Sequence, residues 1–217
     1  MNKVIDLTQL INSSMTVYPG TVPTAIEKYN TIEKDGFAEL KLTFCTHIGT
    51  HIDAPCHILE NMKSLDQFPV DKFIGKAILI PCMHEKEISL EYLKPFKEKI
   101  SKSEFILIFT GWQFKWNTEK YFEDFPVLTE KAAGWLTTFN LKGIGFDAIS
   151  ADKVDFNEKD LSVALRNHNI LLEKEIIIVE NLTNLDKLPD TLFTFQCMPL
   201  KVENADGSPV RAIAILD

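Results

Sequence analysis

Short apolar runs rich in β-branched and aromatic residues recur along the chain, and they predict strands. Several of these runs are apolar at nearly every position, which is typical of a sheet covered on both faces. The predicted strands span residues 4–7, 77–81, 105–110, 143–147, 176–179 and a stretch from residue 191 onward. Near the C-terminus, two such runs flank the sequence Asn-Ala-Asp-Gly at 204–207, whose Asp-Gly pair favours a tight turn, so a β-hairpin is predicted there.

Three other segments carry apolar residues at the three- and four-residue spacing of a helix. The first covers residues 88–100 and contains Pro95, which predicts a kink or a start point. The second covers residues 130–139, with Thr129 placed to cap its N-terminus. The third is predicted over residues 157–168.

The length and composition suit one globular domain. The chain has 217 residues, of which 45% are hydrophobic and 25% charged, and a domain usually takes about 100–200 residues. Because strands and helices alternate in the middle while both ends are β-rich, we predict a single mixed α/β domain spanning residues 1–217. The net charge of −8 runs against the basic footprint that nucleic-acid binding requires, and it also disfavours an anionic membrane surface.

The sequence also predicts a cytoplasmic protein. Its longest apolar runs, residues 105–109 and 176–179, are far shorter than the roughly 20 residues that span a bilayer. Asp6 and Gln9 interrupt the N-terminus, so it lacks the apolar core of a signal peptide. The four cysteines show no C-x-x-C spacing, and we expect each to be a small buried hydrophobic residue.

The histidines are unevenly distributed and mark the candidate chemistry. Three of the five fall within eleven residues, in the sequence His47-Ile-Gly-Thr-His51-Ile-Asp53-Ala-Pro-Cys-His57. Residues 40–45 alternate like a strand, and odd positions of an extended chain share one side, so these imidazoles and Asp53 are expected to converge. A helix would also place the first two imidazoles on one face, although the glycine and the proline of this segment argue against a long helix.

These residue types suit a catalytic metal. Imidazole nitrogen and carboxylate oxygen are ligands that zinc, manganese and ferrous iron accept. Two histidines and one aspartate leave coordination positions open, and a bound divalent ion lowers the pKa of its water from about 15.7 towards about 7. His57, at the end of the segment, would then be free for proton transfer. The alternative is a chance cluster of surface histidines, which is the better explanation for any one of them alone.

The same segment resembles the signature of the metal-dependent cyclase/kynurenine formamidase family, to which bacterial arylformamidases and isatin hydrolases belong. The resemblance implies a swivelling β/β/α-type fold and a homodimer or homotetramer. Further matching segments extend it over nearly the whole chain: Val17-Tyr18-Pro19-Gly20, Gly145-Phe146-Asp147, Ser150-x-Asp152, His168-x-x-Leu171-Leu172, Val179-Glu180-Asn181-Leu182 and Ser208-Pro209-Val210-Arg211-Ala212.

The resemblance also implies a ligand set for one or two divalent ions, zinc first, with manganese or ferrous iron as alternatives. His47 and His51 would bind the first ion, and Asp53 would bridge to a second. His168 would bind that second ion, and Glu180 would complete the bridge.

The function implied by the resemblance is a metal-dependent hydrolase of a small amide, with an arylformamide such as N-formylkynurenine first. Metal-bound hydroxide would attack the carbonyl carbon, and His57, which matches the family's proton-shuttling histidine, would pass a proton to the leaving nitrogen. Tyr18 would contact the substrate, but kynurenine formamidases typically carry Trp there. Hydrolysis of another cyclic amide or ester, such as an isatin-like lactam, is therefore an alternative, as are a metal-dependent cyclase or dehydratase and a non-catalytic metal-binding module.

Other reactive residues fit structural roles better. Cys56 stands at an even position, away from the histidines, and His84 matches no motif and is expected at the surface. The aromatic stretch that includes Trp112 and Trp116 is expected to be core or a dimer interface in preference to the wall of a substrate pocket. The chain contains no G-x-S-x-G elbow, which disfavours a serine hydrolase.

Overall fold

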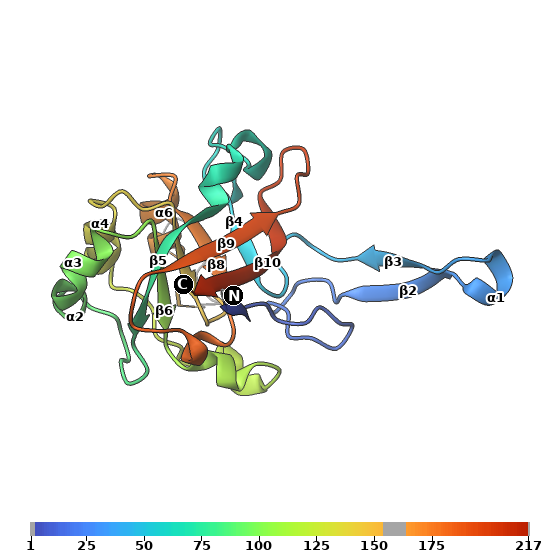
Figure 1. Cartoon of the computed structure of the whole chain (residues 1–217), viewed down its shortest axis with the longest axis horizontal. Helices are drawn as coiled ribbons and strands as arrows, with labels where there is room; N and C mark the ends of the chain where they lie inside the picture. Colours follow the sequence, from blue (N-terminus) through green and yellow to red (C-terminus); the bar gives the residue numbers. More distant parts are fainter. Residues whose placement is uncertain (1–2, 154–163, 217) are drawn as a thin grey trace.

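A mixed β-sheet that closes on itself organises the structure, a computed structural model that describes residues 3–153 and 164–216 (Figure 1). The strands follow the order β1-β10-β4-β8-β7-β6-β5-β9, and an additional pairing between β9 and β10 closes seven of them into a barrel. Strands β5 to β8 pair in parallel, and the other neighbours pair antiparallel. The strands of this sheet are β1 (Lys3–Asp6), β4 (His51–Asp53), β5 (Ile74–Pro81), β6 (Phe105–Phe109), β7 (Gly143–Phe146), β8 (Ile177–Glu180), β9 (Phe193–Pro199) and β10 (Gly207–Leu216).

The apolar runs form strands because both faces of the sheet are covered. In β6, Phe105, Leu107 and Phe109 point into the barrel interior, where side chains from β4, β8, β9 and β10 meet them. Ile106 and Ile108 point outward into a second cluster, made with the helices. The predicted strands and the C-terminal hairpin are thus confirmed, as is the mixed α/β class, whereas the swivelling arrangement stays a prediction.

Helices α2, α3, α4 and α6 gather on one side of the sheet (Figure 1). The predicted segment 88–100 forms α2 (Leu90–Leu93) and α3 (Lys97–Ile100), which are joined by a 3-10 turn that contains Pro95. Helix α4 (Glu130–Leu136) begins where predicted, because the Thr129 side chain accepts a hydrogen bond from the Ala132 amide. In the third predicted segment, residues 157–163 lie outside the described part, and α6 (Arg166–Leu172) carries His168.

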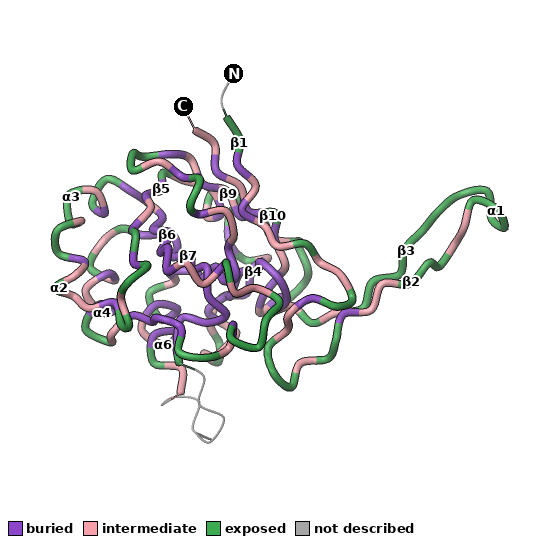
Figure 2. Tube along the Cα trace, turned by 90° about the horizontal axis from the view of Figure 1, so that it is seen from below, coloured by how far each residue is buried: buried purple, intermediate pink, exposed green. Residues whose placement is uncertain are grey.

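A two-stranded ribbon projects from the body, and the sequence pattern predicted only half of it. Strands β2 (Ala25–Asn30) and β3 (Glu39–Thr43) pair antiparallel, with α1 (Ile32–Asp35) at the tip. Figures 1 and 2 show the ribbon extending away from the barrel, and every residue of β3 is exposed. Its position corrects one expectation: Cys45, just beyond β3, is exposed, whereas Cys82 and Cys197 are buried in the body and Cys56 is half-buried.

Two smaller expectations are confirmed. The aromatic stretch forms a third core cluster, in which buried Tyr121 packs with Trp112 and Trp116. His84 is exposed, as expected. Within the described ranges, no helix combines the length and the apolar character that crossing a bilayer requires.

Candidate metal centre

Two neighbouring strands of the closed sheet and one helix bring the predicted residues together. His51 and Asp53 lie on the short central strand β4, and both are buried. The antiparallel register of β4 and β8 places Glu180, the last residue of β8, directly opposite His51. Helix α6, which precedes β8 in the sequence, contributes His168 from its first turn.

The side chains of His47, His51, Asp53 and His57 meet because the chain between them bends. The prediction from their odd spacing was different: an extended chain with all four side chains on one side. Only residues 51–53 are in a strand. Gly49 turns the chain before β4 with φ +56, and a Cβ there would lie 3.2 Å from the Met15 methyl carbon. After β4, Pro55–His57 form a 3-10 helix that turns His57 back over the site. The rings of His47 and His57 are 3.9 Å apart between centroids.

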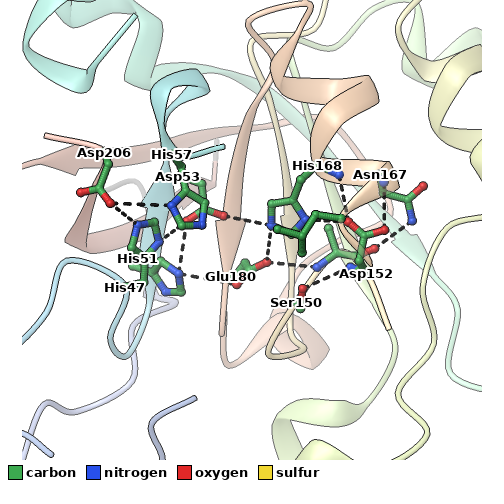
Figure 3. A network of polar contacts seen from close by, with 12 residues as sticks. His47, His51, Asp53, His57, Ser150, Asp152, Asn167, His168, Glu180 and Asp206 are labelled. Carbon is green, nitrogen blue, oxygen red and sulfur yellow. Dashed lines mark hydrogen bonds and ion pairs between the residues drawn. The ribbon is translucent and has the colours of Figure 1, made fainter. Parts of the chain in front are cut away.

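Two carboxylates lie between three imidazoles at the centre of the site (Figure 3). Asp53 Oδ1 lies 2.6 Å from His47 Nδ1 and 3.3 Å from His51 Nε2, and Asp53 Oδ2 lies 3.5 Å from His168 Nε2. The Glu180 carboxylate spans the same gap, with Oε2 3.5 Å from His51 Nε2 and Oε1 3.4 Å from His168 Nε2. Asp53 therefore faces both sides of the cluster.

These separations suit a divalent cation better than direct hydrogen bonds. Four of the five exceed the 2.7–3.2 Å of a good hydrogen bond, and Asp53 Oδ2 is buried with no hydrogen-bond partner. Two ligand atoms that bind one zinc ion at about 2.0–2.1 Å and tetrahedral angles lie about 3.3 Å apart. Three groups among the described residues could each hold an ion: His47–His51–Asp53 and Asp53–His168–Glu180, which overlap at Asp53, and an outer group, His47–His57–Asp206. The donor set of imidazoles and carboxylates is that of a divalent metal.

Each inner imidazole has a second partner on its far nitrogen. His51 Nδ1 lies 2.9 Å from the Gly49 carbonyl oxygen, and His168 Nδ1 lies 2.7 Å from Asp152 Oδ2. His47 Nε2 lies 3.1 Å from Asp206 Oδ2. Such contacts fix which nitrogen of a ligand histidine faces the metal and keep the ring in place.

Burial and neighbouring charge shift the pKa of Asp53 in opposite directions, but at Glu180 the two largest effects act in the same direction. Burial tends to raise the pKa of Asp53, but the charges of His47 and His51 outweigh it and hold this pKa well below its usual range. Burial raises the pKa of Glu180, and the Asp53 charge raises it further. The cluster therefore places two buried carboxylates, Asp53 and Glu180, close together, and a bound cation would relieve their repulsion.

The pKa values of the imidazoles are shifted in opposite directions. Burial tends to lower the pKa of His47, but Asp53 and Asp206 outweigh it and raise it to about 10. The pKa of His168 is likewise raised, because its hydrogen bond to Asp152 and the charge of Glu180 outweigh burial. For His57 burial dominates and lowers the pKa to about 4, so the metal-free site holds His57 neutral at pH 7.

Tyr18 lies on an N-terminal loop beside the cluster. Burial raises the pKa of its hydroxyl, and so does the charge of Glu180, which places the ring within reach of the site's charges. Two reciprocal hydrogen bonds join this loop to Asn117. The Thr16 amide donates to Asn117 Oδ1 at 2.9 Å, and the Asn117 amide donates to Thr16 Oγ1 at 3.0 Å.

Sequence reasoning missed the residues that orient the histidines. Asp206 was assigned only to a hairpin turn, and Asp152 and Asn181 were matched to motifs without a role. Asn181 is buried, and its side-chain amide donates to the Gly49 carbonyl that also accepts from His51. No local signal marks these roles, because the partners lie 159, 16 and 132 residues apart in the sequence.

The comparisons with known proteins agree with this geometry. A family model described as putative cyclase matches residues 5–153. A kynurenine formamidase of Bacillus cytotoxicus is 31% identical over 210 residues, covering 96% of this chain and 95% of the relative. A kynurenine formamidase of Bacillus cereus is 32% identical, with the same coverage.

Solved structures share the fold. Isatin hydrolase A from Ralstonia solanacearum superposes with a TM-score of 0.87 at 23% identity, covering 100% of this chain and 92% of that one. A structure described as a potential metal-dependent hydrolase with cyclase activity superposes with a TM-score of 0.80 at 24% identity, covering 100% of this chain and 99% of that one.

Proposed function

We propose, from the premise that this chain belongs to the cyclase/kynurenine formamidase family, that it is a metal-dependent hydrolase of a small amide. The observation that carries the proposal is the pair of buried carboxylates between three imidazoles, with Asp53 Oδ2 lacking any hydrogen-bond partner. A site that only stabilised the fold would bring a donor within hydrogen-bond distance of that oxygen, whereas His168 Nε2 stays 3.5 Å away, and a missing hydrogen bond on a buried polar atom costs roughly 1–3 kcal/mol or more.

The proposed ligands divide into two groups that share Asp53. His47 and His51 would hold one divalent ion on the Oδ1 side, and His168 and Glu180 would hold a second on the Oδ2 side. Three separations of 3.3–3.5 Å lie within these groups and support the assignment, and the 3.5 Å between Glu180 Oε2 and His51 Nε2 supports Glu180 as a second bridge between them. One ion bound at the shared carboxylate is the simpler alternative, and the metal content of the purified protein distinguishes the two.

When bound, a divalent cation supplies Lewis-acid polarisation of the carbonyl and lowers the pKa of water towards neutrality. The chain's own residues supply the proton transfer and the positioning. His57 is outside the two inner groups, with its side chain 30% exposed, so it can exchange protons with both the site and the solvent. Hydrolysis adds water across the C–N bond, and His57 would take the proton lost by water and return it to the leaving nitrogen.

The substrate proposed first is an arylformamide such as N-formylkynurenine, because the relatives that cover nearly the whole chain are kynurenine formamidases. Tyr18 favours a second candidate, an isatin-like lactam or another cyclic amide or ester. A tyrosine ring offers less stacking area than tryptophan for an aromatic substrate. A cyclase or dehydratase would use the same residues on a substrate without a scissile amide.

The test is hydrolysis by protein of known metal content. We expect metal-stripped protein to be inactive and to recover on addition of Zn²⁺, Mn²⁺ or Fe²⁺, with turnover of N-formylkynurenine, isatin or a simple aryl ester identifying the substrate class. His51→Ala should bind less metal and lose turnover in proportion. Full activity of the metal-stripped protein, or metal-loaded protein inert on the whole panel, would contradict the proposal.

Zinc is the ion we propose first, since imidazole and carboxylate donors at these separations suit it, although manganese and iron accept the same ligands. Elemental analysis of protein purified without added metal decides between them. We also propose a cytoplasmic location, supported by the absence of disulfides among the four cysteines, all of which lie in the described part of the chain. The partner is a small molecule and not nucleic acid or membrane, in keeping with the net charge of −8.

We further propose that the chain forms a homodimer or homotetramer through the β2–β3 ribbon. An isolated two-stranded hairpin is marginally stable in water, yet this one presents Leu40 and Leu42 at 58% and 53% exposure, with Ile32 and Phe37 near its tip. A two-fold interface buries the same patch on both copies, so a second copy of this chain could cover these exposed apolar residues without any other protein.

The ribbon proposal is tested by the mass in solution. We expect the double variant Leu40→Glu, Leu42→Glu to shift the protein towards monomer in light scattering. Lys41→Gln, which lies between them and pairs with Glu27 on the other face, should leave the assembly unchanged. A monomeric parent protein would contradict the proposal.

A further inference from the structure

The turn between β9 and β10 carries a carboxylate into the site from the far end of the sequence. Gly207, the first residue of β10, pairs with Asp53 on β4, and the Ala54 amide donates to the Asp206 carbonyl at 2.8 Å. Asp206 is thereby fixed beside the outer edge of the cluster, where Figure 3 shows it facing His47 and His57. The turn is built for this approach, because any side chain at Gly207 would overlap the His47 ring.

One oxygen of this carboxylate faces two histidines. Asp206 Oδ2 lies 3.1 Å from His47 Nε2 and 3.7 Å from His57 Nδ1. The other oxygen, Oδ1, accepts a hydrogen bond from Thr46 Oγ1 at 3.0 Å, which orients the carboxylate plane. His47 and His57 are in ring contact, so the carboxylate lies across the edge of a stacked pair of imidazoles.

Asp206 differs from the partners of the other two inner histidines. Gly49 and Asp152 are buried and each serves one imidazole, whereas the Asp206 side chain is 44% exposed and serves two. A carboxylate on the far nitrogen of a ligand histidine selects the tautomer that faces the metal. The same carboxylate near Nδ1 of His57 favours the tautomer whose Nε2 is the free proton acceptor.

We propose that Asp206 is a positioning residue that couples the outer metal ligand, His47, to the proton shuttle, His57. It holds the Nε2–H of His47, so that Nδ1 faces the cation beside Asp53, and it steadies His57 in the stacked position. The inference rests on the proposed function for its metal and for the shuttle role, but its first readout, metal affinity, needs no turnover.

The experiment compares Asp206→Asn with variants of two residues outside the turn whose side chains hydrogen-bond to it. Thr46→Val removes only the hydrogen bond that orients the Asp206 carboxylate. Asp66→Asn serves as the control, because Asp66 accepts from the Asn204 amide in the same hairpin loop. For each protein, Zn²⁺ affinity is measured by competition with a chromophoric chelator, stoichiometry at saturation by elemental analysis, and kcat and KM on the identified amide.

We expect Asp206→Asn to weaken Zn²⁺ binding about 10–100-fold, the usual loss when the outer partner of a ligand histidine is removed, with unchanged stoichiometry at saturation. At saturating Zn²⁺, kcat should still fall at least tenfold, because His57 has lost its partner, while KM stays within about twofold. Thr46→Val should lower Zn²⁺ affinity and kcat in the same way but by smaller factors. Asp206→Glu should lose less of both than Asp206→Asn, and Asp66→Asn should match the parent.

Three results would overturn the inference. If Asp206→Asn bound Zn²⁺ with an affinity within twofold of the parent, Asp206 would not orient His47 as a metal ligand. Loss of one ion at saturation would make Asp206 a ligand itself. An equal loss in Asp66→Asn would assign the effect to the loop and not to the carboxylate. Each is distinct from failure of the proposed function, in which the parent protein binds metal but hydrolyses no amide.

Discussion

Gly207→Ala is the sharpest perturbation that the structure offers, because it adds one carbon against one histidine. The new Cβ would lie 2.5 Å from His47 Cε1, 2.6 Å from Nε2 and 3.0 Å from Nδ1. Carbon atoms in contact prefer about 3.5–4.0 Å, so the ring must retreat by about 1 Å. Gly207 is not among the residues with positive φ, so its backbone tolerates alanine and the effect is confined to the ring.

The ring cannot retreat without losing a contact. His47 is held on both sides, by Asp53 Oδ1 at 2.6 Å and by Asp206 Oδ2 at 3.1 Å, and a displacement of about 1 Å breaks at least one of them. Loss of one such contact costs about 10–100-fold in metal affinity, equivalent to about 1.4–2.7 kcal/mol. A misplacement of this size also costs about 100-fold in rate.

The assay is chelator competition for Zn²⁺ followed by kcat at saturating metal, with thermal unfolding of the metal-free protein as the measure of folding. Gly134→Ala is the matched control. Gly134 lies in α4 with nothing within 4 Å of its Cβ position, so alanine should raise stability by about 0.5–1 kcal/mol and leave metal binding and kcat unchanged. Gly207→Ala with parental affinity and parental kcat would refute the placement of His47 at the metal.

Three further results are expected. His57→Ala should retain the metal content of the parent and lose about 10²–10⁴-fold in kcat, the usual contribution of a proton-transfer group, and a parental kcat would remove His57 from the reaction. Zn²⁺ affinity should rise with pH between 6 and 8, by up to about tenfold per pH unit for each proton displaced. The reason is that the pKa of His47 is raised to about 10 without metal, so the cation must displace the proton of this histidine. Chelator competition at three pH values checks this, and an affinity that does not change with pH would contradict it. Tyr18→Trp should lower KM for aryl formamides relative to cyclic amides, and an unchanged ratio of the two KM values would show that Tyr18 does not contact the substrate.

The sequence predicted the parallel strands β6, β7 and β8 because each is an apolar run that is buried at every position, whereas the short strand β4, His-Ile-Asp, has no such run and is not among the predicted strands. It predicted that His47, His51, Asp53 and His57 converge, although by the wrong local geometry. Gly49 and the 3-10 helix at Pro55–His57 bend the chain, where an extended strand was expected.

What the pattern could not predict depends on contacts made after the sheet closes. The order of the strands follows from crossovers that leave no periodic signal, and Asp206 reaches His47 only because β10 pairs with β4. The ribbon strand β2 carries no run of buried residues, since nothing within the described chain covers it. Cys45 is exposed although a small buried residue was expected, because it follows β3, whose residues all face solvent.

The central claim is that the cluster around Asp53 binds a divalent cation that amide hydrolysis requires. The most direct measurement is a titration of metal-stripped protein with Zn²⁺, in which bound metal and hydrolysis of N-formylkynurenine, or of the best amide found on the panel, are followed together. We expect activity to rise from the baseline in step with bound metal, up to one or two ions per chain, and Asp53→Asn neither to bind metal at these concentrations nor to gain activity. Full activity before any metal is added, or parental metal binding by Asp53→Asn, would contradict it.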